Sequence, residues 1–301
     1  MRLMTLCFIC LLSATAWADL TVDGTSTPGL DGGIERFTMY LKDEQLRVDR
    51  PVTKNIDGKE VETVENSILV RFTGEPAGVL FLDHGDRTVK VVATMDVKAD
   101  GQSAGAKAAS ASSARIIKTD ETREILGHMA RRFDFSFNGS IDPMVMVGQQ
   151  VPPELADMLK INLAVTGSSW IVPGMQGEQE FAGFMQKMAE NEMTIGQAVA
   201  GQPVGGSKAG LISAELSSGL KDVMTQLSKH GLPVQTTTNS NMSVALEGQM
   251  AVMMQGMLDG LGINGNYPSE TIATRVDAAP IDAALFYDGG VPDGYTVSYL
   301  E

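Results

Sequence analysis

The stretch VLFLDHGDRTVKVV at residues 79–92 decides the expected fold class. Two short runs of apolar and β-branched residues flank Asp83-His84-Gly85-Asp86, whose aspartates and glycine suit a tight turn. This arrangement is typical of a β-hairpin. The stretch at residues 36–49 has the same form, because apolar and polar residues alternate on both sides of Lys42-Asp43-Glu44-Gln45. The first third of the chain therefore predicts an antiparallel meander.

More strands are expected towards the C-terminus. In the strand after His128, Met129, Phe133, Phe135 and Phe137 share one face, because side chains alternate along a strand. Further extended segments are expected at residues 68–72, 115–117, 161–172, 232–238 with a continuation at 243–246, 271–276 and 283–287.

Helices are expected in the middle and late parts of the chain. Residues 178–193 carry Phe181, Phe184, Met185 and Met188 at the spacing of one helical face. A second helix is expected over about 208–229, closed by His230-Gly231. A third, at 248–265, has a stripe of four methionines, Met250, Met253, Met254 and Met257, and a short helix is expected at 154–160 after Pro152-Pro153. These apolar stripes predict helices that pack on the sheet.

The N-terminus has the pattern of a secretory signal peptide. A basic start, an apolar run at residues 3–12 and Ala16-Trp17-Ala18 predict cleavage between Ala18 and Asp19. The alternative is a retained N-terminal anchor. Cys7 and Cys10, the two cysteines of the chain, lie in this segment, so the mature protein is expected to have no disulfide or thiolate chemistry. We therefore expect an exported, periplasmic protein with no transmembrane segment after cleavage, and a single domain at 19–301.

Residues 98–113 interrupt the domain. The stretch consists of Ala, Ser, Gly and a few polar residues, and it has no large apolar side chain. It therefore cannot bury enough surface to offset the entropy of ordering, and a flexible loop is expected.

Composition and charge exclude several classes of protein. The chain of 301 residues has 23 Lys and Arg against 37 Asp and Glu, a formal net charge of −14. A negative field repels nucleic acid phosphates and anionic lipid head groups, so neither is an expected partner. The oligomeric state has no sequence signal.

Motifs for catalysis and metal binding are weak. Gly101-Gln102-Ser103-Ala104-Gly105 matches GxSxG but has no strand before it and no helix after it. A glycine-rich stretch at 201–208 ends in Ser207-Lys208, whereas a phosphate loop ends in Lys followed by Ser or Thr. His84, His128 and His230 are far apart, and the acidic pairs fall in expected turns. We expect no enzyme, no cofactor and no metal.

Methionine is the distinctive residue type, with 18 in the chain. Thioethers bind Cu(I), so the methionine helix at 248–265 is a candidate copper site. Methionine also fills irregular gaps and forms adaptable apolar surfaces. Met185 and Met188 lie on a core-facing stripe, which favours this second interpretation. A Cu(I) titration would separate the two interpretations.

Several segments resemble an uncharacterised family of exported bacterial proteins, the domain of unknown function 4412. The similar segments are residues 39–49, 80–91, 121–128 with Ile125-Leu126-Gly127-His128, 168–172 with Trp170, 231–234 with Pro233, and 291–295 with Pro292-Asp293-Gly294-Tyr295. The sequence departs from the family by the 98–113 stretch, by an extension around Met144 and Met146, and by the methionine helix.

The resemblance implies a fold similar to the LolA and LolB lipoprotein carriers. That fold is α+β, with a curved antiparallel sheet, an open half-barrel, covered on its concave side by helices. Those carriers hold acyl chains between the sheet and the helices.

The leading hypothesis is a non-enzymatic periplasmic protein that binds an apolar ligand, a lipid or a lipoprotein acyl chain, between sheet and helices. The expected ligand contacts are Phe181, Phe184, Met185, Met188, Met250, Met253, Met254 and Met257. The alternative is a structural or interaction protein of the cell envelope with no small-molecule ligand, favoured if the sheet-helix interface is fully packed. An enzyme would need a polar cluster assembled from distant strands.

Overall fold

The computed structural model describes residues 19–27, 34–94, 114–141, 159–190, 214–246 and 265–299. The predicted signal peptide, the predicted flexible loop at 98–113 and the four methionines Met250, Met253, Met254 and Met257 lie outside the described residues, as does most of the short helix expected at 154–160. Those predictions, and the single domain at 19–301, stay predictions.

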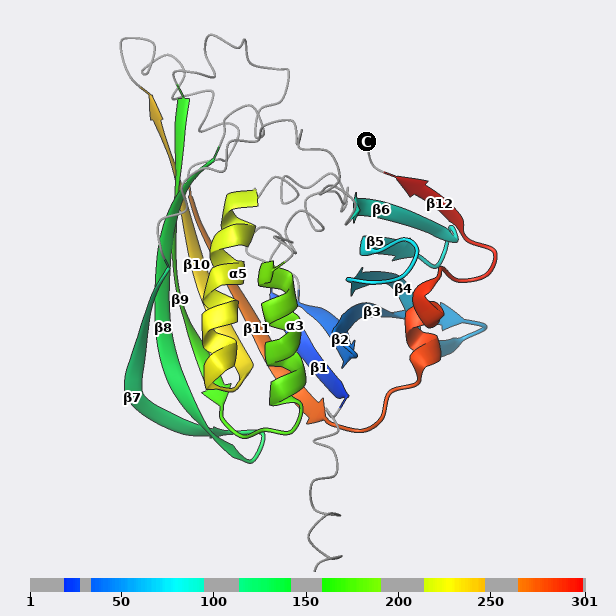
Figure 1. Cartoon of the computed structure of the whole chain (residues 1–301), viewed down its shortest axis with the longest axis horizontal. Helices are drawn as coiled ribbons and strands as arrows, with labels where there is room; N and C mark the ends of the chain where they lie inside the picture. The colour runs from blue at the N-terminus through cyan, green and yellow to red at the C-terminus, as the bar shows by residue number, and fades with distance from the viewer. Residues whose placement is uncertain are drawn as a thin grey trace, which may run out of the picture.

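A single 12-stranded sheet dominates the structure (Figure 1). Its strands lie in the order β12-β6-β5-β4-β3-β2-β1-β11-β10-β9-β8-β7. All neighbours are antiparallel except β12 and β6, which are parallel. The strands are β1 Leu20–Thr27, β2 Glu35–Lys42, β3 Gln45–Ile56, β4 Lys59–Arg71, β5 Gly78–Asp83, β6 Thr88–Thr94, β7 Arg115–Ile125, β8 His128–Ile141, β9 Leu159–Val172, β10 Leu232–Leu246, β11 Gly265–Asp277 and β12 Thr296–Tyr299.

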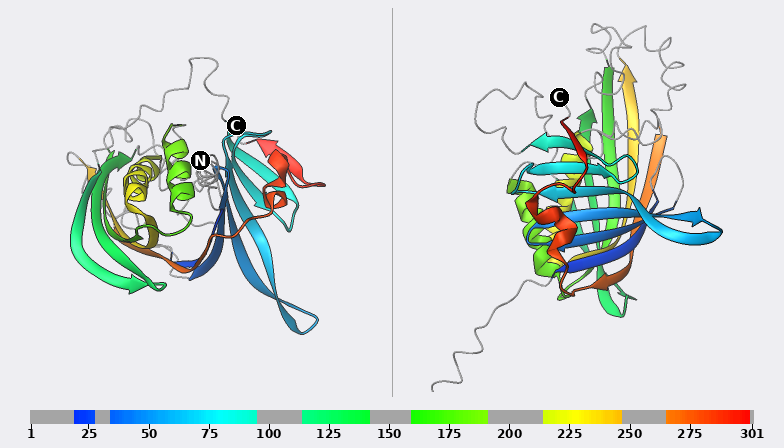
Figure 2. Two further views of the ribbon diagram at one scale, coloured as in Figure 1. Left: turned by 60° about the horizontal axis from the view of Figure 1, so that its bottom comes forward. Right: turned by 90° about the vertical axis from the view of Figure 1, so that its right-hand side faces the viewer.

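Few helices accompany the sheet. Two α-helices, α3 Glu178–Glu190 and α5 Ala214–Leu227, lie side by side within the curve of the sheet (Figures 1 and 2). A short 3₁₀ helix, η4 Ser228–His230, follows α5, and a second, η5 Ala283–Gly289, lies near the C-terminus. Among the described helices, none is long and apolar enough to cross a membrane.

The expected fold class, an antiparallel sheet covered by helices in the manner of LolA and LolB, is wrong. The sheet is mixed and not closed, and the described helices are too few and too short to cover it. The antiparallel part of the expectation is confirmed, because ten of the eleven pairings between described strands are antiparallel. The stripes at 178–193 and 208–229 identify helices, but a stripe does not measure how much of a sheet a helix covers.

The local predictions agree better with the structure. The hairpins expected at 36–49 and 79–92 are β2–β3 and β5–β6, and the helices expected at 178–193 and 208–229 contain α3 and α5. The strand expected at 283–287 is wrong, because this segment is η5. The Asp282 side chain accepts a hydrogen bond from the Ala284 N–H at 2.9 Å and so starts a helical turn there.

The inner face of the sheet, towards α3 and α5, carries the main core. Large apolar side chains of β1 to β5 pack with Phe184 and Met188 of α3, and those of β8 and β9 pack with Val223 and Leu227 of α5. In β8, Phe133, Phe135 and Phe137 point inward, as the alternation predicted, whereas Met129 at the start of the strand is 60% exposed.

Two glycines let aromatic rings lie close to the backbone on this face. Gly167 of β9 pairs directly with Phe135, and a Cβ at Gly167 would overlap its ring. Gly219 of α5 faces Phe137 of β8, and a Cβ there would lie closer than 3.0 Å to that ring. Glycine at 219 therefore sets how closely α5 approaches the sheet.

The outer face of the sheet has two halves. Over β4 to β6, residues 281–299, here called the strap, cover an apolar strip (Figure 2). Ile281 and Phe286 of the strap are buried against Leu69, Leu80, Leu82, Val89 and Val91. Over β7 to β11 and β1, the outer face is polar.

Both ends of the open sheet are poor templates for pairing with another strand. The register of β7 shifts between Lys118 and Thr122, and the residues from Asp120 to Glu124 are all exposed and mostly charged. At the other end, β12 has only four residues. Bulges, charges and short strands are the usual protection of sheet edges.

Candidate functional site

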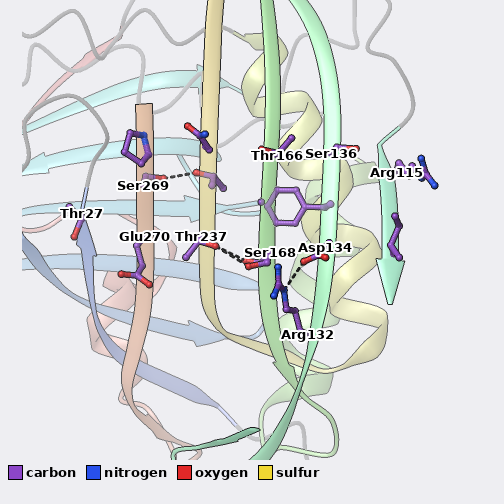
Figure 3. A pocket seen from close by; sticks show the side chains of 16 residues that line it. Thr27, Arg115, Arg132, Asp134, Ser136, Thr166, Ser168, Thr237, Ser269 and Glu270 are labelled. Carbon is purple, nitrogen blue, oxygen red and sulfur yellow. Dashed lines mark hydrogen bonds and ion pairs between the residues drawn. The ribbon is translucent and has the colours of Figure 1, made fainter. Parts of the chain in front are cut away.

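The polar half of the outer face holds an open groove of about 800 Å³ (Figure 3). Helix α5 lies behind the strands in this view, so the groove is on the side of the sheet away from the helices. Its lining contains hydroxyls, one amide, four charged side chains and a few apolar groups: Thr27, Arg115, Ile117, Arg132, Asp134, Phe135, Ser136, Thr166, Gly167, Ser168, Thr237, Thr238, Asn239, Pro268, Ser269 and Glu270.

Strand register places these side chains in rows. Asp134 of β8 is opposite Ser168 of β9, which is opposite Thr237 of β10. Thr237 is opposite Glu270 of β11, and Glu270 is opposite Thr27 of β1. Directly opposed residues share a face. A second row, of Ser136, Thr166, Asn239 and Pro268, runs beside the first. The groove floor is thus hydroxyls and an amide, and in the first row Ser168 and Thr237 separate the carboxylates of Asp134 and Glu270.

Three of the four charged side chains of the groove, Arg132, Asp134 and Glu270, have partners. The Arg132 guanidinium donates to Asp134 at 2.7 Å and to Glu121 at 3.0 Å. These hydrogen bonds, to Glu121 first and then to Asp134, raise the pKa of Arg132. Across the groove, Gln235 donates to Glu270 at 2.7 Å. The hydroxyls of Ser168 and Thr237 lie 3.0 Å apart and form a hydrogen bond.

An aromatic side chain lies beside the groove. Trp170 shares a row with Arg132 and Gln235 and is half-buried. The Arg123 guanidinium lies 4.0 Å above the centre of the indole ring and also donates to the Gln235 side-chain oxygen. The exposed Arg123 therefore covers a flat apolar surface that adjoins the polar rows.

The two groove carboxylates are too far apart for paired acid–base chemistry. Asp134 and Glu270 are separated by three strand spacings, roughly 14 Å across the sheet. Two-carboxylate glycosidases need about 5 to 9.5 Å between the groups. The described residues also contain no cluster of three side chains fit to hold a metal ion. The arrangement suits binding.

A second polar cluster is buried under the strap. Arg47, Asp49 and Ser67 are 6%, 4% and 1% exposed. Arg47 Nε donates to Asp49 at 2.6 Å, and Ser67 Oγ donates to the same carboxylate oxygen at 2.6 Å. Burial lowers the pKa of Arg47, but the hydrogen bond and charge of Asp49 outweigh burial and raise it. Ser67 Oγ also lies 2.7 Å from Nε2 of His84.

The Ser67–His84 pair resembles part of a catalytic triad, but the carboxylate bonds to the serine and not to the histidine. In a triad, the carboxylate orients the histidine and leaves the serine free to attack. Here Asp49 binds the serine hydroxyl, and the other histidine nitrogen, Nδ1, bonds to the Tyr295 hydroxyl at 2.6 Å. Ser67 is also too buried for a substrate to reach. The cluster therefore has a structural role.

The sequence-predicted contact residues fall into two groups. Phe181, Phe184, Met185 and Met188 come together on α3, at most 8% exposed and packed against the sheet. The four methionines of the predicted helix lie outside the described residues. A ligand contact at either group stays a prediction.

The three histidines lie in separate parts of the structure, as their spacing in the sequence predicted. His84 lies in the β5–β6 turn, His128 starts β8, and His230 ends η4, where its ring stacks on Phe133 at 4.8 Å. The partners of His84, and every residue of the groove, were missed from sequence. Polar residues at alternating positions of neighbouring strands were the signal for the groove, but an ordinary solvated face has the same pattern.

Comparisons with known proteins show no family. No family model matches the chain, and no curated protein matches it. One solved structure, described as PNGF-II in a C2 space group, aligns with 94% of this chain at 10% sequence identity and a TM-score of 0.33. The chain spans 31% of the length of that structure. A score this low assigns neither a fold nor a function.

Proposed function

We propose that this protein is an exported, non-enzymatic binding protein that recognises a neutral oligosaccharide in the outer-face groove. The observation that carries the proposal is the lining of the groove, in which hydroxyls and an amide form the floor between balanced charges. Export rests on the signal-peptide pattern at residues 1–18.

Charge balance favours a neutral ligand. Arg115 and Arg132 are matched by Asp134 and Glu270. A phosphate group would meet two carboxylates, and a cation would meet two guanidinium groups, so each would be repelled at one part of the site. A sugar offers hydroxyls that both donate and accept, which suits a floor of serine, threonine and asparagine side chains.

Trp170 supplies the apolar part of the recognition. One face of a sugar ring carries C–H groups, which pack on a flat indole, and amphipathic aromatic rings are common at binding surfaces. Arg123, which covers the ring and is exposed, would move aside or bond to a sugar hydroxyl. An acyl chain would instead displace water from the groove hydroxyls and charged groups without replacing its hydrogen bonds, at a cost in free energy.

The geometry favours binding over hydrolysis. The wide separation of Asp134 and Glu270 leaves no carboxylate pair that could act on one glycosidic bond. The buried Ser67–His84 pair is closed by the strap and bound to Asp49.

The apolar ligand predicted between sheet and helices is the second candidate. It is supported by the stripe of Phe181, Phe184, Met185 and Met188, which faces the sheet. However, Phe184 and Met188 are 2% and 0% exposed and already packed, so an acyl chain would have to displace them. An interaction protein without a small ligand is the outcome if neither compound class binds.

Trp170 fluorescence tests the proposal. The chain has two tryptophans, Trp17 and Trp170, and Trp17 lies in the predicted signal peptide, so the fluorescence of a protein that begins at Asp19 reports on Trp170 alone. Neutral oligosaccharides should shift its emission and saturate, whereas inorganic phosphate and a fatty acid should not. Changing Ser168→Ala and Thr237→Val together should weaken binding by about 5-fold to about 150-fold, because two hydrogen bonds are worth about 1 to 3 kcal/mol.

Ser243→Ala is the matched control. Ser243 is exposed on the same strand as Thr237 but does not line the groove, so its loss should leave affinity unchanged. If no neutral oligosaccharide shifts the emission, or if the control weakens binding as much as the double variant, the proposal is wrong.

A further inference from the structure

The strap is held to the outer face of β4 to β6 by polar anchors as well as by its apolar contacts (Figure 1). Arg47 Nη1 donates to the Leu285 carbonyl at 2.7 Å and to the Tyr287 hydroxyl at 3.0 Å. Arg71 Nη1 donates to the Gly290 carbonyl at 2.6 Å. Side chains of the sheet therefore bind the strap backbone at two places. His84 binds the strap at a third place, the side-chain hydroxyl of Tyr295.

The hydrogen-bond network assigns the proton of His84. The Asp49 carboxylate can only accept, so Ser67 donates its single hydroxyl proton to Asp49. Ser67 must then accept from His84, which places the ring proton on Nε2. Nδ1 is left as an acceptor, and the Tyr295 hydroxyl donates to it. In this network the docked strap holds a neutral His84.

Charged groups face His84 from several elements. Arg47 and Asp49 come from β3, Asp83 ends β5 just before His84, and the Tyr295 hydroxyl comes from the strap, where the Tyr287 hydroxyl bonds to Arg47. Burial lowers the pKa of His84 first, and the Arg47 charge lowers it further. The charges of Asp49 and Asp83 act in the opposite direction but do not outweigh these two effects.

The docked strap also carries unfavourable features. Arg71 is fully buried, its Nη2 has no hydrogen-bond partner among the described residues, and burial lowers its pKa. Tyr287 and Asp288 adopt left-handed conformations, with φ of 56° and 46°, which non-glycine residues adopt at a cost. Release of the strap would hydrate Arg71 and relax both residues. The docked state is therefore opposed by costs that the apolar contacts must exceed.

We propose that the strap is a proton-operated latch, in which protonation of His84 releases residues 281–299 from the sheet and uncovers the apolar strip of β4 to β6. A proton from solvent adds to Nδ1, and the Tyr295 hydroxyl must turn its hydrogen away and find another acceptor. The new cation also lies beside the buried Arg47. Both effects weaken the docked state.

The sign of the pH dependence follows from the lowered pKa. When the strap is released, His84 is exposed to water and binds a proton at about pH 6.5. When the strap is docked, His84 binds a proton only at lower pH. The strap is therefore most stable above that pH, and its docking weakens as the pH falls through the range between the two values.

Hydrogen exchange of the full chain at about pH 7.5 and about pH 5.0 tests the latch, with rates corrected for the intrinsic effect of pH. The amides of Ile281 and Thr296, which donate to Asp19 and to the Arg87 carbonyl, should exchange at least about tenfold faster at the lower pH. Peptides of β9 and β10 should keep their protection, because the latch lies in the other half of the sheet.

Two variants isolate His84. His84→Gln cannot take a proton in this range, so the pH difference in strap exchange should vanish. The control His128→Gln removes an exposed histidine of β8 and should keep the difference. If His84→Gln does not fold, Tyr295→Phe serves instead, because it removes the hydroxyl from Nδ1 and should loosen the strap at both pH values.

Three outcomes would overturn the latch. One is equal protection of the strap at the two pH values. Another is a pH difference in strap exchange that persists in His84→Gln. If His84→Gln does not fold, this second outcome is replaced by a strap in Tyr295→Phe that is as protected as in the unmodified protein. The third is a loss of protection in β9 and β10 together with the strap, which would indicate general acid unfolding.

Discussion

Replacing Gly219 by alanine changes the free energy of unfolding through two opposing effects, helix propensity and packing. In the interior of a helix, alanine is favoured over glycine by about 1 kcal/mol. At Gly219, however, the new Cβ would lie closer than 3.0 Å to the ring of Phe137, which is 4% exposed and fixed in the core between α5 and β8. Such overpacking costs about 1 to 3 kcal/mol. We therefore expect Gly219→Ala to lower the free energy of unfolding by up to about 2 kcal/mol.

Urea unfolding followed by circular dichroism measures this change. The control repeats the substitution in a Phe137→Leu background, where the ring that the methyl group would meet is gone. Compared with its own parent, Gly219→Ala should there be neutral or stabilising by up to about 1 kcal/mol. If Gly219→Ala stabilises the unmodified protein by about 1 kcal/mol, the close approach of α5 to β8 is not real and the packing argument fails.

Three other substitutions test the buried polar groups and the strap. Asp49→Asn leaves Arg47 without its carboxylate and should lower the free energy of unfolding, measured in urea, by about 3 to 5 kcal/mol. An Arg47→Leu/Asp49→Leu variant should recover part of this loss. A loss below about 1 kcal/mol in Asp49→Asn would contradict the assigned pairing. Phe286→Ala should remove about 3 to 5 kcal/mol of apolar packing and expose the strap to hydrogen exchange, and unchanged strap protection would argue against its role as an anchor. Glu180→Gln should stabilise the protein near neutral pH, because burial raises the pKa of Glu180, so the folded state loses stability as the pH rises above the usual carboxyl range. Thermal melts of this variant and its parent should coincide at about pH 4 and separate at about pH 7, and equal melts at both would contradict the shift.

Local periodicity predicted the parts of the fold in which one face of an element is buried. The β2–β3 and β5–β6 hairpins and the stripe of α3 were found because their apolar residues recur at the period of a strand or a helix. The stretch from Lys54 to Asn66 has no such face, yet it forms the paired ends of β3 and β4. Residues 283–287 are apolar enough for a strand, but the Asp282 cap and the packing of Phe286 on the sheet give a 3₁₀ helix.

The groove and the buried cluster depend on register, which periodicity does not contain. Thr237 and Glu270 become neighbours only when β10 pairs with β11, and Ser67 meets His84 only when β4 pairs with β5 and the turn folds back over it. Each residue alone has an ordinary strand or turn role. Their chemistry is a property of the assembled sheet, so a single sequence could not predict it.

The Asp19 carboxylate links the first described residue to the far end of the chain. It accepts from Lys42 Nζ at 2.7 Å and from the Ile281 N–H at 2.6 Å, although Ile281 is 262 positions away. A chain that began at Leu20 would keep all of β1 but lose this link, and the start of the strap would hold less firmly. Cleavage between Ala18 and Asp19, which we propose, would keep this link, and cleavage one residue later would remove it and loosen the C-terminal segment.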